Sequence, residues 1–397
     1  MIVIRIQNHG IFALLSLLAA VTTFSSAGFA DHFSTGKDVI LRNGAPFVVK
    51  GVVYVPAYPG YLPWELAEKD EIPKELKHSI RQDLQSIKAM GANTIRLWDA
   101  PPYVYQAIRE IGGLAIIQTI WFDVTQNDLQ DEAFKKRCQM TIQKIIGRIY
   151  DSYGSDTPPI LAYLAGNELS NKSIHSTNEK HPEISEYEGE YVSAPKGSSA
   201  AECFLAEMAD FLKGYEFKKY GRTGLVSYAN EVRTAQAIDT PFLDFRSFNG
   251  YSNSIHDDVT PKEGSAAKSA FQGWIETLKS QYPDKPLLIT ETGLSVSPGA
   301  PRVGPPDYGY GANTEIEQAE ALLERWKDVT TANPAAAGMC VHEFLDAWWK
   351  FGLKDSLTQD PNDVEEWFGL AAIKPKGKWY KTKLRPSYNR LKAVWTN

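Results

Sequence analysis

The sequence predicts a (β/α)8 barrel preceded by a short β-hairpin, in the α/β fold class, and three observations carry this prediction. Short apolar runs rich in β-branched residues alternate with amphipathic segments, which is typical of parallel βαβ units. There are eight such runs, and eight parallel strands close a barrel of this kind. The chain has 397 residues, and α/β barrels commonly use about 250 residues or more as one domain.

The first expected element is a hairpin, in which Val39–Arg42 and Phe47–Lys50 flank an Asn-Gly turn. The expected barrel strands are Val48–Tyr54, Thr94–Trp98, Leu114–Phe122, Ile160–Gly166, Leu225–Ala229, Phe242–Phe248, Pro286–Thr290 and Gly338–Phe344. The expected helices are Lys74–Met90, Tyr103–Ile111, Asp131–Tyr153, Ala200–Tyr220, Ala266–Gln281, Thr314–Thr331 and Pro386–Val394. A weak helical pattern near Arg233–Ile238 stands where the fifth helix is expected.

The alternative architecture is an open, doubly wound sheet. Such a sheet usually places a glycine-rich phosphate-binding turn after its first strand, but residues 55–59 read Val-Pro-Ala-Tyr-Pro. Gly309 and Gly311 lie in a late loop without the full glycine spacing, which indicates an ordinary turn. Two long connections, 169–199 and 292–313, follow strands, and we expect both on the face of the barrel where active sites form.

Charge and the N-terminal segment narrow the possible partners. The net charge is −6 with no basic block, which argues against nucleic acid as a partner. Arg5, the apolar run Ile11–Val21 and the small-residue site Gly28–Ala30 together predict a signal peptide that is removed before Asp31. The apolar run is shorter than the roughly 20 residues of a spanning helix, although an uncleaved anchor stays the alternative. We therefore expect residues 31–397 to form a secreted or periplasmic barrel without a membrane span.

The cysteines and histidines show no metal-binding pattern. Cys138, Cys203 and Cys340 are too widely spaced for a ligand motif, and the chain has no HExxH sequence. The sequence thus predicts neither a metal nor a cofactor, and it leaves open whether Cys138 and Cys203 form a disulfide. Aromatic residues are plentiful, with 10 Trp and 19 Tyr, which is consistent with stacking on sugar rings.

Two glutamates follow apolar strands and are the strongest candidates for chemistry. Glu168 comes directly after the fourth expected strand, and Glu291 comes directly after the seventh. Strand ends converge on one rim of a barrel, so these carboxyl groups can face each other. Hydrolysis of a glycosidic bond needs such a pair, one protonated to assist the leaving oxygen and one ionised to attack the anomeric carbon. A retaining pair is expected to lie about 5–5.5 Å apart.

Several stretches of the chain carry a family resemblance. They are Phe47–Tyr54, Gly91–Trp98, Gly166–Glu168, Thr290–Gly293, Glu343–Lys350 and Glu366–Leu370. Together they resemble the retaining glycoside hydrolases of clan A, and in particular the family 2 and family 5 hydrolases and the family 72 β-1,3-glucanosyltransferases. The resemblance covers nearly all of residues 31–397. It implies a barrel that hydrolyses or transfers β-linked sugars, with an oligo- or polysaccharide of the β-glucan type as substrate.

The resemblance also implies roles for individual residues. Glu168 would be the acid/base and Glu291 the nucleophile, while Asn167 would hydrogen-bond the sugar 2-hydroxyl. Arg96, at the end of the second strand, would pair with the nucleophile, and Tyr251 would donate a hydrogen bond to it. The remaining sugar-binding candidates are Tyr54, which ends the first of these stretches, and Trp348 in the late one; Trp349 shares the stacking role with Trp348 as an alternative.

The chain departs from the clan pattern at the eighth strand, where His342 occupies a position at which members often carry Trp. Asp99 and Asp123 also follow strands, and we interpret them as solvated or helix-capping residues, whereas Glu231 is a candidate sugar contact.

Two other functional classes stay open. One is a catalytically silent carbohydrate-binding barrel, which the presence of both glutamates disfavours. The other is a two-lobed solute-binding protein, which eight repeated units disfavour.

Overall fold

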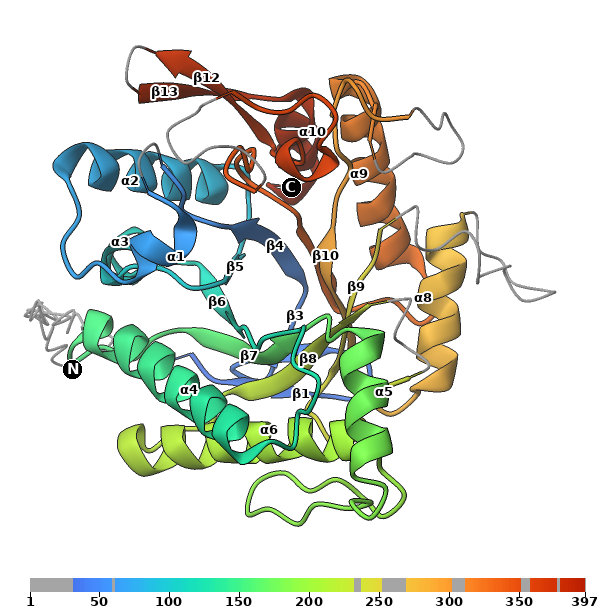
Figure 1. The fold of residues 1–397 in the computed structure, drawn as a ribbon. Helices are drawn as coiled ribbons and strands as arrows, with labels where there is room; N and C mark the ends of the chain where they lie inside the picture. Colours follow the sequence, from blue (N-terminus) through green and yellow to red (C-terminus); the bar gives the residue numbers. More distant parts are fainter. Residues whose placement is uncertain are drawn as a thin grey trace, which may run out of the picture.

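The eight expected strands form a closed parallel barrel in the order β10-β11-β4-β5-β6-β7-β8-β9 (Figure 1). The computed structural model describes residues 31–58, 61–231, 237–251, 269–301, 311–350, 358–376 and 379–396. The barrel strands are β4 (Val49–Tyr54), β5 (Thr94–Leu97), β6 (Ala115–Ile120), β7 (Ile160–Asn167), β8 (Leu225–Glu231), β9 (Arg246–Asn249), β10 (Leu287–Thr292) and β11 (Gly338–Val341). Closure confirms the predicted barrel and overturns the open-sheet alternative.

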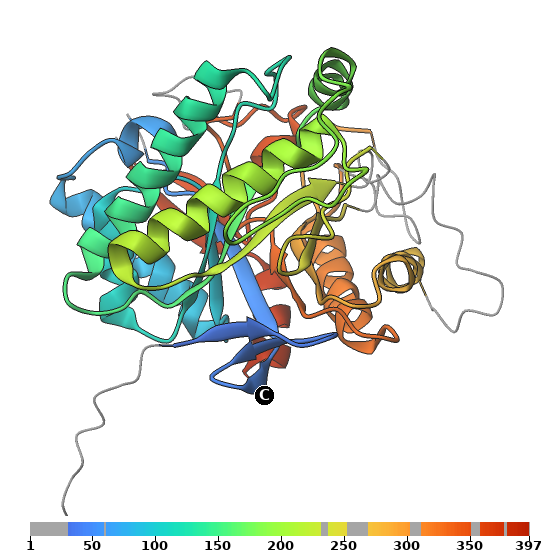
Figure 2. The same ribbon diagram turned by 90° about the horizontal axis from the view of Figure 1, so that it is seen from below.

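Amphipathic helices surround the barrel and cover its outer face (Figures 1 and 2). They are α2 (Lys74–Ala89), α3 (Pro102–Ile111), α4 (Glu132–Tyr153), α6 (Ala200–Tyr220), α8 (Ala270–Gln281), α9 (Glu315–Thr331) and α10 (Pro386–Trp395). Capping fixes several starts: Ser199 and Glu202 form a reciprocal capping box at α6, as Thr314 and Glu317 do at α9. The weak pattern expected at Arg233–Ile238 lies mostly outside the described residues.

A small antiparallel sheet covers the end of the barrel opposite the carboxyl ends of its strands (Figure 2). It comprises β1 (Phe33–Thr35), β2 (Ile40–Arg42) and β3 (Ala45–Phe47). Asn43 and Gly44 have φ of 54° and 80°, the left-handed values that a two-residue hairpin turn requires. Phe33 and Ile40 are buried with residues of the barrel interior. The predicted hairpin is thus present with one additional strand, but its second strand is Ala45–Phe47 rather than Phe47–Lys50, because Val49 and Lys50 begin β4.

Several short elements have no counterpart among the predicted ones. These are α1 (Pro63–Ala67), α5 (Asn171–Lys180), the 3-10 turn η2 (Val364–Glu366) and the hairpin of β12 (Ala371–Lys376) and β13 (Trp379–Leu384). The hairpin is attached to the barrel because Tyr380 stacks on Tyr58 with ring centroids 5.7 Å apart. The 3-10 turn, α1 and the two strands have three to six residues each, and α5 is polar apart from Ile174, so none of them leaves a strong hydrophobic period in the sequence.

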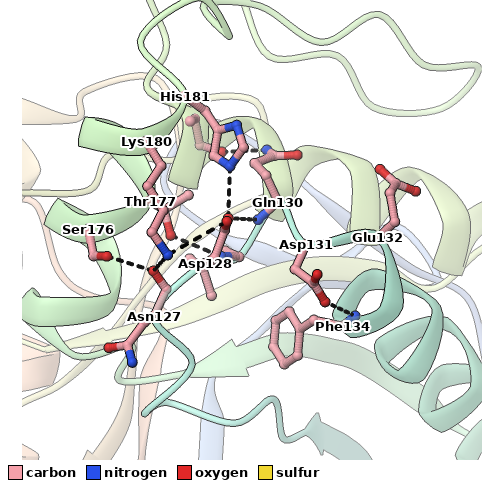
Figure 3. Close-up of polar contacts among 12 residues, drawn as sticks. Asn127, Asp128, Gln130, Asp131, Glu132, Phe134, Ser176, Thr177, Lys180 and His181 are labelled. Carbon is pink, nitrogen blue, oxygen red and sulfur yellow. Dashed lines mark hydrogen bonds and ion pairs between the residues drawn. The ribbon is translucent and has the colours of Figure 1, made fainter.

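The long connection 169–199 divides into two parts with different positions. Its first part forms α5 on the active-site rim, where Asp128 of the segment after β6 accepts a 2.9 Å bond from His181, and Ser176 donates to the Asn127 carbonyl at 2.7 Å (Figure 3). Its second part folds away over α6, whose Asp210 accepts bonds from the backbone of Tyr191 and Val192. The expectation that the whole connection lies on the active-site face was therefore wrong.

The structure also bears on the possible disulfide and on the possibility of a membrane-spanning helix. Cys138, Cys203 and Cys340 are all buried free thiols, so the possible disulfide does not form. In the part of the chain that the structure describes, no helix combines the length and apolar character that crossing a membrane requires.

Candidate active site

The two candidate catalytic glutamates are placed by matching irregularities in their strands. In β7, the pairing with β8 shifts by one residue between Leu164 and Asn167, immediately before Glu168. In β10, the pairing with β9 shifts by one residue between Ile289 and Glu291. An extra residue in one strand re-aims the side chains that follow it. Both glutamates therefore leave the regular alternation of the barrel at the same rim.

The backbone at Glu168 is held in an unusual conformation. Its φ is 46°, which a non-glycine residue adopts only when surrounding contacts fix it. The Glu168 amide donates to the Ala229 carbonyl at 2.9 Å, and the next amide, of Leu169, donates to the Tyr228 hydroxyl at 2.8 Å. Gly166, with φ of 92°, lies in the irregular end of β7 just before it, in a conformation that glycine adopts readily. Strain of this kind concentrates at functional sites.

Arg96 is the central cation of the site and is fully buried. Its Nη1 lies 2.8 Å from Glu291 Oε1 and donates to the Thr290 carbonyl at 2.8 Å. Its Nη2 donates to Asn167 Oδ1 at 2.8 Å, and its Nε donates to Thr119. A guanidinium cannot lose its proton in a protein, so Glu291 has a permanent positive partner. The predicted pairing of Arg96 with the nucleophile candidate is present.

Tyr251 supplies the second polar partner of Glu291. Its hydroxyl donates to Glu291 Oε2 at 2.7 Å. The tyrosine ring is fixed edge-on against His342, at a centroid distance of 6.2 Å, and against Phe368 at 5.8 Å. Both carboxylate oxygens of Glu291 thus have a charged or hydrogen-bonding partner, as an ionised nucleophile needs.

Asn249, at the end of β9, links Glu168 to Arg96, the ion-pair partner of Glu291, and was missed by the sequence reasoning. Its Nδ2 donates to Glu168 Oε1 at 2.8 Å and to Asn167 Oδ1 at 3.1 Å. Its Oδ1 accepts from Arg96 at 3.3 Å and from Thr290 at 2.9 Å. The only signal in the sequence was a polar residue at the end of the sixth strand, next to the predicted Tyr251.

Glu168 and Glu291 occupy different electrostatic environments. Burial raises the pKa of Glu168 from 4.5 to about 7, and the negative charge of Glu291 acts in the same direction. The hydrogen bond from Asn249 opposes this rise, and Glu231 adds to it from the end of β8. Glu168 is therefore about half protonated at pH 7, beside a carboxylate that is paired with Arg96. The arrangement combines a proton donor and an ionised carboxylate, and differing environments of this kind define acid and nucleophile roles.

The pH dependence of activity follows from the pKa of Glu168. Below pH 7 the carboxyl is protonated and can act as an acid; above it, this form is lost by about a factor of ten per pH unit. We expect the alkaline limb of kcat/KM for a substrate with a poor leaving group to fall near pH 7. Initial rates across pH 4–10 measure it. An alkaline limb above pH 9, or a Glu168→Ala variant with the same limb, would contradict the assignment.

His342 and Glu343 extend the site at the end of β11. The His342 Nδ1 lies 3.9 Å from Glu291 Oε2, and its Nε2 lies 3.6 Å from Glu343 Oε1. Burial lowers the pKa of His342 well below its usual value, with Lys350 and Arg96 acting the same way, so the ring is neutral. Burial shifts the pKa of Glu343 in the opposite direction, raising it to about 8. His342 therefore lies between the nucleophile candidate and a second, mostly protonated carboxyl.

Tyr54 and Trp348 are the two predicted sugar-binding residues that the structure places elsewhere. The Tyr54 side chain is fully buried, and its hydroxyl donates to Asp83 of α2 at 3.0 Å, which points it at the helix layer. Trp348 is also fully buried and belongs to the hydrophobic core. Trp349, the alternative, is half-buried against Trp64, a tryptophan that is 57% exposed, at a centroid distance of 6.0 Å. Trp349 and Trp64 therefore form an aromatic pair that solvent reaches, unlike Trp348.

Replacing Trp348 by alanine is expected to affect stability rather than substrate binding. Removing a fully buried indole leaves a cavity and costs about 3–5 kcal/mol of unfolding free energy. Urea unfolding measures this loss, and the KM of the folded variant should match that of the wild type. Trp64→Ala is the control, with a stability change within about 0.5 kcal/mol because its ring is exposed. A raised KM with unchanged stability would return Trp348 to the binding site.

Of the other strand-end acids, Asp123 has the capping role expected of it, Asp99 forms a part-buried ion pair instead of a solvated or helix-capping contact, and Glu231 lies close to the site. Asp99 pairs with Arg148 and accepts from the Ala100 amide. Asp123 accepts from the backbone and hydroxyl of Thr125, which makes it a loop-capping residue. Glu231 lies near enough to Glu168 to raise its pKa. Among exposed aromatics, Trp121 follows β6 directly and is 49% exposed.

The fold and the site define a (β/α)8 barrel with a carboxyl pair, Glu291 buried and Glu168 partly buried, at the ends of its seventh and fourth strands. No protein-family model matches the chain, and no curated protein sequence matches it. Solved structures share its fold. A GH2 β-galacturonidase from Eisenbergiella tayi bound to glycerol matches with a TM-score of 0.60 and 18% identity, over 92% of this chain and 54% of that one.

A second match has a related description. The β-glucuronidase from Ruminococcus gnavus in complex with a C6-substituted uronic isofagomine has a TM-score of 0.60 and 16% identity, over 92% of this chain and 52% of that one. The chain therefore spans about half the length of the solved structures it matches. At these identities the likeness is one of fold.

Proposed function

We propose that this protein is a retaining β-glycoside hydrolase or transglycosylase that acts on a β-glucan-like polysaccharide, with Glu168 as acid/base and Glu291 as nucleophile. One observation carries the proposal: a carboxyl with a pKa of about 7 lies beside a carboxylate held by Arg96 and Tyr251. The fold of GH2 β-glycosidases supports it. The resemblance to families 5 and 72 stays a prediction.

The reaction divides into two displacements. Glu168 gives its proton to the glycosidic oxygen as the bond to the anomeric carbon breaks, and Glu291 attacks that carbon to form a glycosyl ester. Glu168, now ionised, takes a proton from water or from a sugar hydroxyl, whose oxygen displaces Glu291. Water gives hydrolysis and a sugar hydroxyl gives transfer. Arg96 and Asn249 both donate hydrogen bonds to Asn167 Oδ1. The Nδ2 of Asn167 is therefore the group that donates a hydrogen bond to the sugar 2-hydroxyl.

Charges around the site favour a neutral sugar over a uronate. The two structural neighbours are described as enzymes of galacturonides and glucuronides. In this chain, Arg96 is engaged by Glu291, and the ammonium of Lys350 lies 2.7 Å from Glu365. Both cations of the described site are thus ion-paired, and a substrate carboxylate would lie near Glu291 and Glu365 without its own cation. A neutral glucan carries no such cost.

A panel of β-glucans and mannans, with products followed by size, tests the proposal. Shorter products alone indicate hydrolysis, and longer products indicate transfer. An aryl β-glucoside and the matching β-glucuronide provide the comparison of charge, and we expect the glucoside to react faster. Binding of glucans without any turnover would favour the silent carbohydrate-binding barrel instead. Faster reaction of the glucuronide would contradict the neutral-sugar assignment.

We also propose export, with residues 1–30 removed, as the signal-peptide pattern indicates. The segment lies outside the described residues. The expected result is an exported chain that begins at Asp31. Intact-mass measurement of the exported protein decides this, and a mass that retains Met1 to Ala30 would contradict cleavage.

A further inference from the structure

A cavity of about 490 Å³ lies on the outer face of α6, on the side layer of the barrel rather than at its active-site rim. The second part of connection 169–199 forms one wall, where Tyr187 and Ala194 pair as a narrow β-bridge. Helix α6 forms the floor, and Gln139 of α4, the neighbouring helix in Figure 2, closes one side. None of its lining residues belongs to the candidate active site.

Four aromatic side chains line this cavity, and all are only partly buried: Tyr187, Tyr191, Phe211 and Tyr215. Phe211 and Tyr215 lie one turn apart on α6, with ring planes only 9° from parallel and centroids 6.4 Å apart. The two rings therefore lie nearly parallel to each other one turn apart, and both border the cavity. Flat apolar faces of this kind suit the C–H faces of successive sugar rings.

Polar groups between the rings are fixed in position. Asp210 accepts from the Tyr191 amide at 2.6 Å, from the Val192 amide at 3.0 Å and from the Tyr187 hydroxyl at 3.2 Å. Lys219 donates to the Tyr215 hydroxyl at 3.2 Å. Asp210 thus holds the wall of the cavity against its floor, so the aromatic faces are ordered before a ligand arrives.

We propose that this cavity is a second glycan-binding site, which holds a neutral segment of the polysaccharide whose other segments reach the active site of this or a neighbouring molecule. Its volume lies in the range of ligand pockets, about 300–1,000 Å³. Its lining combines ring faces with carboxylates, an amide and ammonium groups, which are acceptors and donors for hydroxyls. Three acidic residues (Glu190, Glu207 and Asp210) and two basic residues (Lys218 and Lys219) line the cavity. Their charges nearly cancel, so the site does not select a strongly charged ligand. The choice of glucan rests on the proposed function.

The function of such a site is to keep the enzyme on its polymer. A second contact on the same chain raises the effective concentration of substrate at the active site without changing the chemistry there. We therefore expect the cavity to matter for insoluble or long β-glucan and not for a small aryl β-glycoside.

The test compares a double variant, Phe211→Ala with Tyr215→Ala, with the wild type. We expect the fraction bound to insoluble β-glucan to fall roughly tenfold, while turnover of an aryl β-glucoside is unchanged. Tyr103→Ala is the matched control, because Tyr103 is also a half-buried helical tyrosine with an ammonium, that of Lys77, over its ring at 5.2 Å. Unchanged glucan binding by the folded double variant, or no binding by the wild type, overturns the proposal.

Hydrogen–deuterium exchange keeps the test decisive if the double variant does not fold. In the full-length Glu291→Gln protein, a β-glucan oligosaccharide should protect residues 185–196 and 207–219, separately from the active-site strands. Protection at the strands alone overturns the second site but leaves the proposed function intact. The proposed function is overturned instead if the Glu291 variants keep their turnover of the aryl glycoside. If sedimentation gives a lower molecular mass for the double variant than for the wild type, and glucan binding is unchanged, the cavity binds a second copy of the chain and the glycan proposal is overturned.

Discussion

Replacing Glu291 by glutamine is expected to lower kcat by on the order of 10⁴-fold or more, because the amide can neither attack the anomeric carbon nor form the glycosyl ester. The fold should persist, since glutamine has nearly the same shape and Tyr251 can still donate to its carbonyl oxygen. Steady-state rates on an aryl β-glycoside measure the effect. Asp99→Asn is the control, as this strand-end carboxylate also pairs with an arginine but lies away from Glu168 in the described contacts.

Trapping the intermediate adds a direct readout of the same residue. A 2-fluoro glycoside with a good leaving group should label the wild-type enzyme once, and peptide mass spectrometry should locate the sugar on Glu291. The Glu291→Gln variant should stay unlabelled. A label on Glu343, or more than a tenth of wild-type activity in Glu291→Gln, would sink the assignment.

Replacing Glu168 by alanine is expected to have a large effect that depends on the leaving group. Loss of general acid catalysis costs about 10²–10⁴-fold on substrates whose leaving oxygen needs a proton. Aryl glycosides with acidic phenols need none in the first step, so the glycosyl-enzyme should form readily and then persist. Burst kinetics followed by slow turnover would show this accumulation.

Azide separates this role from a structural one. The ion needs no base to resolve the glycosyl-enzyme, so it should restore the rate of Glu168→Ala and give a β-glycosyl azide. The same concentration of azide should leave the wild type unaffected. An α-configured azide, or no rescue in a folded variant, would contradict Glu168 as the acid/base.

The strands were predictable because each is a short apolar run, and because glutamates directly past such runs stand at a barrel rim whatever the exact register. Arg96 was predicted from the family resemblance of the stretch Gly91–Trp98, not from the apolar pattern. The structure adds what residue order alone does not contain. Asn249 makes hydrogen bonds to groups on three other strands, and only the closed barrel brings these together.

The predicted sugar-binding roles of Tyr54 and Trp348 were wrong for a physical reason. In a parallel barrel both faces of a strand are buried, so apolar residues occupy inward and outward positions alike. On β4, Val53 packs into the barrel interior while Val52 and Tyr54 pack in the core under the helices. The sequence does not show which alternation faces inward. For Trp348, the direction depends on the irregular segment after β11, where no period applies.

The stereochemistry of the first product tests the central claim most directly. Proton NMR of a β-glycoside reaction, recorded within the first turnovers and before the sugar anomers interconvert, shows which anomer the enzyme releases. A double displacement through Glu291 predicts the β-anomer first, with the α-anomer appearing only by later mutarotation. Initial release of the α-anomer would mean single displacement by water, and it would contradict the assignment of Glu291 as a nucleophile.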